Sequence, residues 1–117
     1  MGLVGLLSIF GCSETTYKPG DLYSVDDGKG KIAIVKVLVV DPKVIHLRLY
    51  KNTFEERPKT IDTKELSLGR IGEEGAIGIG HIPLDIAGFK DWKPELLLNE
   101  EVKKEELVGY NFWKESQ

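Results

Sequence analysis

Two strand-forming runs joined by a tight turn constrain the fold of this chain more than any other feature. Lys31 to Val40 is dense in Ile and Val, which favour extended backbone. Asp41-Pro42 follows, and proline suits the second position of a tight turn because its φ is already fixed there. Val44 to Tyr50 then largely alternates apolar and polar residues. The sequence therefore predicts an antiparallel hairpin over residues 31–50.

The turn also determines which side chains share a face of this hairpin. Continuous pairing places Val40 opposite Ile45 and Leu38 opposite Leu47. One face is then apolar except for Lys36, and we expect it to be the core. The other face is half apolar, and we expect the C-terminal helix or the N-terminal segment to cover it. The first face comprises Ile32, Ile34, Lys36, Leu38, Val40, Ile45, Leu47 and Leu49, and the second comprises Ala33, Val35, Val37, Val39, His46, Arg48 and Tyr50.

Turn, cap and periodicity signals predict shorter elements around the hairpin. Gly and Pro mark turns, and Asp marks helix starts because its carboxylate accepts from the free N–H groups of the first turn. The expected strands cover Leu22–Val25 and Ala76–Pro83. The expected helices are one or two turns from Asp62 through Leu68, a short helix capped by Asp85, and a helix over Glu101–Glu115. In the short helix, we expect Ile86, Phe89 and Trp92 to point inward.

These elements predict an α+β fold that is mainly β. We expect a curved antiparallel sheet or a small barrel with a C-terminal helix. A chain of 117 residues suits a single domain. Within residues 1–117 we expect an apolar N-terminal segment over 1–16, a β-rich body over 17–83 and a helical C-terminal part over 84–117.

The expected C-terminal helix has an apolar stripe. Leu107, Tyr110 and Trp113 recur at three-residue spacing and so share one side of a helix. We expect this side to pack on the sheet and to cover the hairpin face near Val35 and Val37. The alternative is an exposed aromatic stripe that contacts a partner.

The N-terminal run from Gly2 to Cys12 is apolar and allows several interpretations. It resembles a bacterial lipoprotein signal, which would leave a lipid anchor at Cys12 after cleavage. However, it lacks a preceding Lys or Arg, is short, and carries Phe10 where such signals have a small residue. The alternatives are a segment docked on the core and a disordered start. Because a single cysteine suits a reducing compartment, we expect a cytoplasmic protein without a membrane span, with the lipid anchor as the alternative.

Charge is segregated along the chain although the net charge is only −3. Residues 29–59 carry eight basic side chains against three acids, whereas residues 60–117 carry seven against twelve. Either the basic part meets an anionic partner, or the two parts neutralise each other within the fold. The chain lacks the surplus of basic charge that is typical of RNA-binding proteins, so we expect a protein partner and no nucleic acid.

No sequence pattern indicates catalysis, a metal or a cofactor. His46 and His81 are the only histidines, and a zinc site needs three or four ligands at suitable spacing. The glycines of residues 75–80 run in the reverse order of the dinucleotide-binding fingerprint, and no phosphate loop or nucleophile elbow occurs. We therefore assign no catalytic residue, no metal ligand and no cofactor.

Four residues are candidates for a ligand site. His46, Arg48 and Tyr50 share one face of the hairpin, and a later strand brings His81 into the same half of the fold. A small-ligand or hydrolytic site there requires the two histidine rings to lie within hydrogen-bonding or metal-sharing distance in a concave pocket. Lys36 either pairs with an acid at the rim of the sheet or joins these residues to bind an anion, which requires a bulge in its strand.

Several motifs resemble known groups of proteins. The Gly20-Asp21 turn and the glycine loop that leads into the strand at Lys31 resemble SH3-like or KOW-type small barrels, which serve protein or RNA contact. A group of small bacterial β-rich proteins without an assigned activity is similar at Tyr17–Asp21, Lys36–Leu38, Gly80–Leu84 and Glu105–Tyr110 with Trp113. Some immunity proteins of bacterial toxin systems open with a similar Pro-Gly-Asp turn.

These resemblances, the segregated charge and the missing catalytic patterns favour one class of function. We expect a non-enzymatic protein-interaction module, with an immunity-type inhibitor as its specific form. The alternative is a small-ligand or hydrolytic site around His46 and His81.

Overall fold

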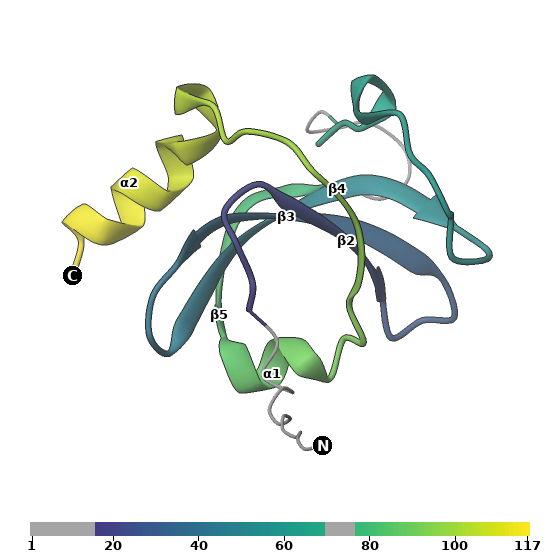
Figure 1. Ribbon diagram of the computed structural model, residues 1–117. Coiled ribbons are helices and arrows are strands. Elements are labelled where there is room, and N and C mark those ends of the chain that lie inside the picture. The colour runs from purple at the N-terminus through teal and green to yellow at the C-terminus, as the bar shows by residue number, and fades with distance from the viewer. Residues whose placement is uncertain (1–15, 70–76) are drawn as a thin grey trace, which may run out of the picture.

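The computed structural model describes residues 16–69 and 77–117, which form a curved sheet of five antiparallel strands with short helices around it (Figure 1). The strands are β2 (Asp21–Asp26), β3 (Ile32–Val40), β4 (Val44–Phe54), β5 (Ile79–Asp85) and β6 (Glu95–Asn99). The helices are η1 (Thr63–Glu65), α1 (Ile86–Lys90), η2 (Lys104–Leu107) and α2 (Val108–Glu115). In space the strands follow the order β5-β4-β3-β2-β6, so the predicted hairpin β3–β4 lies at the middle of the sheet.

The fold is mainly β, as predicted, and the sheet is open. β5 and β6 occupy its two edges and do not pair with each other within the described part of the chain. A curved sheet is thus confirmed in place of a closed barrel. Of the predicted N-terminal segment, residues 1–15 lie outside the described residues.

Most predicted elements are present, with changes at their ends. The Asp62 side chain accepts from the Lys64 N–H, but the helix that it caps is only the single turn η1. The predicted C-terminal helix begins later than expected, because residues 101–103 are not helical. Strand β6 has no sequence prediction, since it follows Pro94 closely and its three consecutive leucines do not alternate with polar residues.

A β-bulge in β3 makes part of the predicted register wrong. Val40 faces Ile45 as predicted, but Leu47 faces Val37 and not Leu38. Leu38 is an extra residue between two paired positions, and one extra residue reverses the faces of the strand residues that precede it. The core face therefore carries residues that the continuous register had divided between two faces, namely Ala33, Val35, Val37, Ile45 and Leu47. The opposite face, called the outer face below, carries Ile34, Lys36, Val39, His46 and Arg48.

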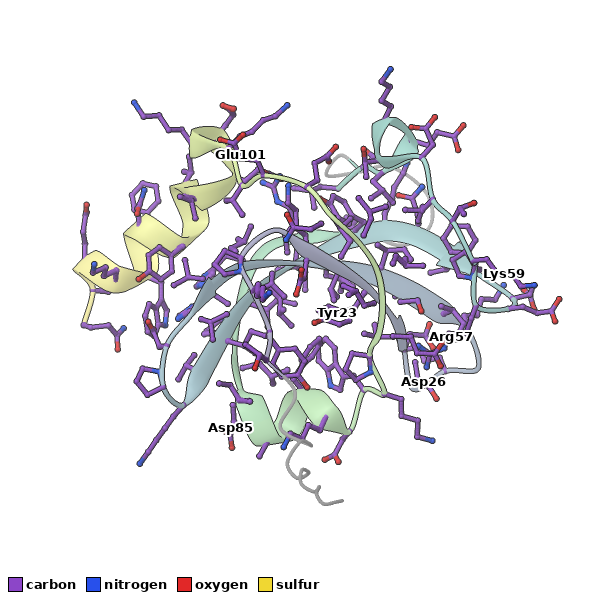
Figure 2. The ribbon with its side chains drawn as sticks, in the orientation of Figure 1. Tyr23, Asp26, Arg57, Lys59, Asp85 and Glu101 are labelled. Atoms are coloured by element: carbon purple, nitrogen blue, oxygen red, sulfur yellow. The ribbon has the colours of Figure 1, made fainter. Side chains whose placement is uncertain are left out.

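Aromatic rings fill the core face of the sheet. Phe89 of α1 is fully buried, and its ring packs edge-on against Tyr17 and Tyr23 with centroids 5.2 and 5.8 Å away. Tyr23 points from β2 into the space between the sheet and α1 (Figure 2). The Asp85 carboxylate caps α1 by accepting from the N–H of Ala87. The inward direction predicted for Phe89 is confirmed, and α1 closes the core on this side.

Candidate functional site

The residues from Glu101 to Gln117, called the C-terminal strap below, lie against the outer face of the sheet. The helices α1 and α2 are on opposite sides of the sheet (Figure 1). No residue of α2 is fully buried, so the strap is not part of a second core. A few side chains attach it, and these side chains define the candidate site.

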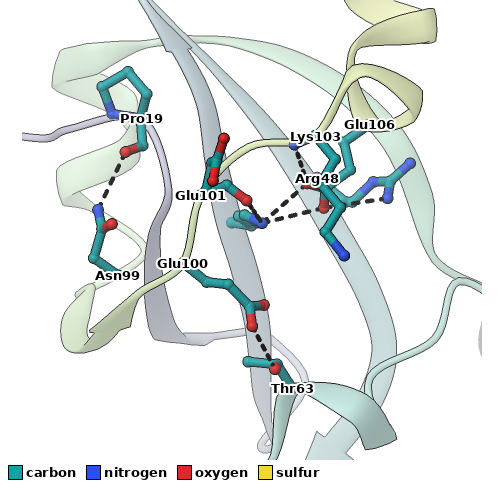
Figure 3. Close-up of polar contacts among 9 residues, drawn as sticks. Pro19, Arg48, Thr63, Asn99, Glu100, Glu101, Lys103 and Glu106 are labelled. Carbon is teal, nitrogen blue, oxygen red and sulfur yellow. Dashed lines mark hydrogen bonds and ion pairs between the residues drawn. The ribbon is translucent and has the colours of Figure 1, made fainter.

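Lys36 is the first attachment point of the strap. It lies in the middle of β3 and is only 2% exposed. Its Nζ donates to the Glu106 Oε1 at 3.0 Å and to the backbone carbonyl of Glu101 at 2.9 Å, so both bonds reach the strap (Figure 3). A buried ammonium needs such partners because its desolvation is costly. Lys36 is thus paired with an acid, which was one of its two predicted roles, but in the middle of the sheet and not at the predicted rim.

Arg48 adds a second cation beside Glu106. It is the cross-strand neighbour of Lys36, and its Nη1 lies 3.6 Å from the Glu106 Oε2. Burial alone would raise the pKa of the Glu106 carboxyl, but the Lys103 N–H, the Lys36 ammonium and the Arg48 guanidinium together hold this pKa below its usual range. Glu106 is therefore held ionised between two strand cations that would otherwise repel each other.

The two histidines form the second attachment point. His46 Nδ1 lies 2.9 Å from His81 Nε2, and the two ring planes are nearly parallel, with an interplanar angle of 11°. On its other side, His46 Nε2 lies 2.9 Å from the Asp41 Oδ2. His46 is fully buried, and within the described part of the chain its two ring nitrogens have these two hydrogen-bond partners. The three side chains form one hydrogen-bonded chain from the β3–β4 turn to β5.

Aromatic side chains of α2 close over the histidines. Tyr110 and Trp113 meet the His46 ring at centroid distances of 4.8 and 4.7 Å, both edge-on. Gly109 permits this approach, because a Cβ at that position would lie only 2.7 Å from the His81 Cβ. The helix therefore rests directly on β5, and the imidazole pair is enclosed beneath it.

The predicted location of the aromatic stripe is wrong. Tyr110 and Trp113 cover the two histidines, whereas Val35 and Val37 lie in the core on the opposite face. The physical reason is the bulge at Leu38, which turns these two valines inward and brings Lys36 to the same side as the histidine pair.

Tyr50 and Arg48 belong to the ion-pair end of the site. Burial, together with the negative charge of Glu106, raises the pKa of Tyr50 to about 12. Its phenol therefore stays protonated near neutral pH and can donate a hydrogen bond. Of the four candidate ligand-site residues, the structure joins His46 to His81 and places Arg48 and Tyr50 in the neighbouring group around Glu106.

The geometry of the histidine pair favours a structural role over catalysis. A general base or nucleophile has to reach its substrate, and His46 is enclosed by Asp41, His81 and the α2 aromatics. Among the described residues, no group of three or more His, Cys, Asp or Glu side chains is arranged to hold a metal ion. The arrangement can bind a helix and take up protons.

A cavity on the core face is lined by one of the four candidate residues, Tyr50. It has a volume of about 220 Å³ and is lined by Leu49 and Trp92 with Asp26 and Lys29 among its polar residues. This volume is below the roughly 300–1,000 Å³ of common ligand pockets. Neither histidine lines it, so it does not supply the concave pocket required for the predicted ligand site.

The exposed side of α2 carries a feature that the sequence prediction missed. Phe112 is 70% exposed and Val108, one helical turn earlier, is 53% exposed. These two residues, called the outer α2 pair below, lie opposite the stripe that binds the histidines. Their spacing of four residues is the signal in the sequence for a second apolar side of this helix, in addition to the side that carries Tyr110 and Trp113.

Neither protein-family models nor curated proteins nor solved structures give a match to this chain. Within residues 16–69 and 77–117, no helix has the length and hydrophobicity needed to cross a membrane. The chemistry of the strap and of the sheet beneath it is therefore the basis for assigning a role.

Proposed function

We propose that this protein is a non-enzymatic interaction module that binds another protein through the outer α2 pair. The observation that carries this proposal is the 70% exposure of Phe112 beside the half-exposed Val108. Exposed aromatic residues that lie together with other apolar side chains are typical of protein contact sites, where they become the anchors of binding.

The attachment of α2 supports this role. A helix of eight residues is not stable in water by itself, so its shape depends on the sheet beneath it. The Glu106 carboxylate fixes one end of the strap, and Tyr110 and Trp113 fix the helix over the histidines. The helix that carries Phe112 is thereby held in place before a partner arrives, which lowers the entropy cost of binding.

The charge around the outer α2 pair suits a basic partner. Residues 100–117 contain three lysines and five acids, of which Glu106 is already paired with Lys36 and Arg48, and the whole of residues 60–117 is acidic. Acidic surfaces accelerate the encounter with basic proteins and orient them. An immunity-type inhibitor of a basic bacterial effector fits this combination of an acidic surface and a rigid aromatic anchor.

The alternative function uses the histidine pair. His46 and His81 lie within hydrogen-bonding distance, which is one of the two conditions for a small-ligand or hydrolytic site, the other being a concave pocket. Such a site would open only if α2 moved away, because Tyr110 and Trp113 cover the rings. The exposed anchor needs no such movement, and protein binding is therefore the preferred function.

Photocrosslinking in the native host tests the proposal. A photoreactive benzoylphenylalanine at position 112 is compared with the same group at position 114, since Lys114 is also exposed but lies on another side of α2. We expect one discrete adduct from position 112 and none from position 114. Excess unlabelled protein should suppress the adduct, whereas excess of a Phe112→Ser variant should not. Equal adducts from both positions, or none from position 112, would refute this role for α2.

A further inference from the structure

The hydrogen bond between the two histidines limits how many protons the pair can hold. At 2.9 Å, His46 Nδ1 and His81 Nε2 have to be one donor and one acceptor. In the neutral pair, His81 Nε2 donates to His46 Nδ1, and His46 Nε2 donates to the Asp41 carboxylate. Every contact is then satisfied without a net charge on either ring.

A first added proton is tolerated by this chain of groups. When His46 is the imidazolium, both of its nitrogens donate, one to Asp41 and one to His81. Its charge lies beside a carboxylate, which is favourable. A second proton is different, because two N–H groups would then face each other at 2.9 Å between two cations. The pair can hold the second proton only by separating.

We propose that the His46–His81 pair is an acid-sensitive latch, which releases α2 from the sheet when both rings become protonated. Separation of the rings disturbs α2 directly, because Tyr110 and Trp113 pack on both imidazoles and Gly109 lies against the His81 Cβ. The latch is a property of the fold and holds whether or not the outer α2 pair binds a protein.

Among residues 16–69 and 77–117, the groups that contact the pair do not supply a second counter-charge. Asp41 faces His46 from the β3–β4 turn and compensates one proton. From α2, Tyr110 and Trp113 contribute neutral rings, and Pro83 lies opposite His46 on β5. Arg48, two residues along β4, is a cation whose nearby carboxylate Glu106 is shared with Lys36. Of these groups, only Asp41 favours an imidazolium, so the doubly protonated pair is unstable in place.

The direction of the pH effect follows from the titration of the groups. Burial, together with the neighbouring His46, lowers the pKa of His81 from its ordinary value of 6.5. A released His81 therefore takes up its proton at a higher pH than a docked one, so docking is strongest above about pH 6.5 and weakens as the pH falls below it. The Glu106 pKa is also lowered from 4.5, so the ion-pair attachment fails only at still lower pH. As the pH falls, α2 should therefore detach from the sheet before the part of the strap around Glu106 does.

An NMR titration of the unmodified chain from about pH 8 to about pH 4.5 tests the latch. The ring nitrogen shifts report protonation of each histidine, and the nuclear Overhauser effect between the Trp113 indole and the His46 ring reports docking. We expect this signal to disappear as the second proton binds, while the amide shifts of β2 and β3 persist. Each pH unit in this range shifts the ratio of docked to released helix by at most about tenfold.

A matched variant shows whether the second imidazole is responsible. In His81→Gln the amide can donate to His46 Nδ1 but does not titrate, so α2 should stay docked until Glu106 is protonated. Release of α2 in this variant at the same pH as in the wild-type chain would overturn the proposal. So would a wild-type Trp113–His46 signal that persists with both rings fully protonated, or one that disappears only when β2 and β3 unfold.

Discussion

Replacement of Phe89 by Ala is expected to lower the free energy of unfolding by about 3–5 kcal/mol. The Phe89 ring is fully buried and packs edge-on against Tyr17, Tyr23 and Trp92, with centroids 5.2–5.9 Å away. Its removal leaves a cavity beneath α1 and also loses the favourable ring contacts. Equilibrium denaturation in urea measures the effect.

Phe112 provides the matched control for this substitution. It is the same residue type on a short helix but is 70% exposed, so Phe112→Ala should change the free energy of unfolding by less than about 0.5 kcal/mol. A similar loss of stability in the two variants would show that burial does not distinguish the two rings. The assignment of the core to the α1 side of the sheet would then be wrong.

Replacement of Glu106 by Gln is expected to cost about 3 kcal/mol. The substitution leaves the buried ammonium of Lys36 and the partly buried Arg48 without a carboxylate, and Lys36 keeps only neutral acceptors, namely the Glu101 carbonyl and the amide oxygen at position 106. An unpaired buried charge is costly, whereas loss of an exposed ion pair is almost neutral. Thermal and urea denaturation of the variant measure this difference.

Two comparisons separate the charge effect from a loss of packing. Glu105 is exposed, so Glu105→Gln should leave stability within about 0.5 kcal/mol of wild type. The double change Lys36→Met with Glu106→Leu removes both charges and should recover most of the loss. If Glu106→Gln is as stable as the wild-type chain, the ion pair does not attach the strap.

Local sequence signals were sufficient for most of the fold. The β3–β4 hairpin, the turn between its strands and the Asp85 cap each depend on neighbouring residues, and the structure contains all three. The bulge at Leu38 depends instead on how both faces of β3 pack, which the sequence pattern does not contain. Because one bulge exchanges the faces of a strand, the error extended to the predicted core.

The sequence predicted only part of the candidate site, because the other contacts of the site also depend on tertiary packing. The residue types at Lys36, His46 and His81 indicated an unusual polar group on the sheet, and the requirement for a bulge was part of that prediction. Lys36 and the histidines have separate partners, and both sets come from the strap; the Glu101 contact of Lys36, for example, is 65 residues away in the sequence. Contacts over such a separation are set by tertiary packing, so neither the Glu106 pair nor the cover by α2 follows from local patterns.

The Gly109→Ala variant most directly tests whether the docked helix presents Phe112 to a partner. The added Cβ would lie 2.7 Å from the His81 Cβ, so α2 has to leave its place on β5. Alanine also favours helix by roughly 1 kcal/mol over glycine, so a loss of docking would not reflect a weaker helix propensity.

The measurement is the yield of the position-112 crosslink in the Gly109→Ala chain, relative to the same crosslink in a Lys114→Ala chain. Lys114 is exposed and serves as the matched site on the same helix. If α2 has to be docked for binding, the adduct should persist in the Lys114→Ala chain and should fall in the Gly109→Ala chain to the background level of position 114. An undiminished adduct in Gly109→Ala would contradict the account, because the partner would then bind Phe112 without the sheet that holds α2.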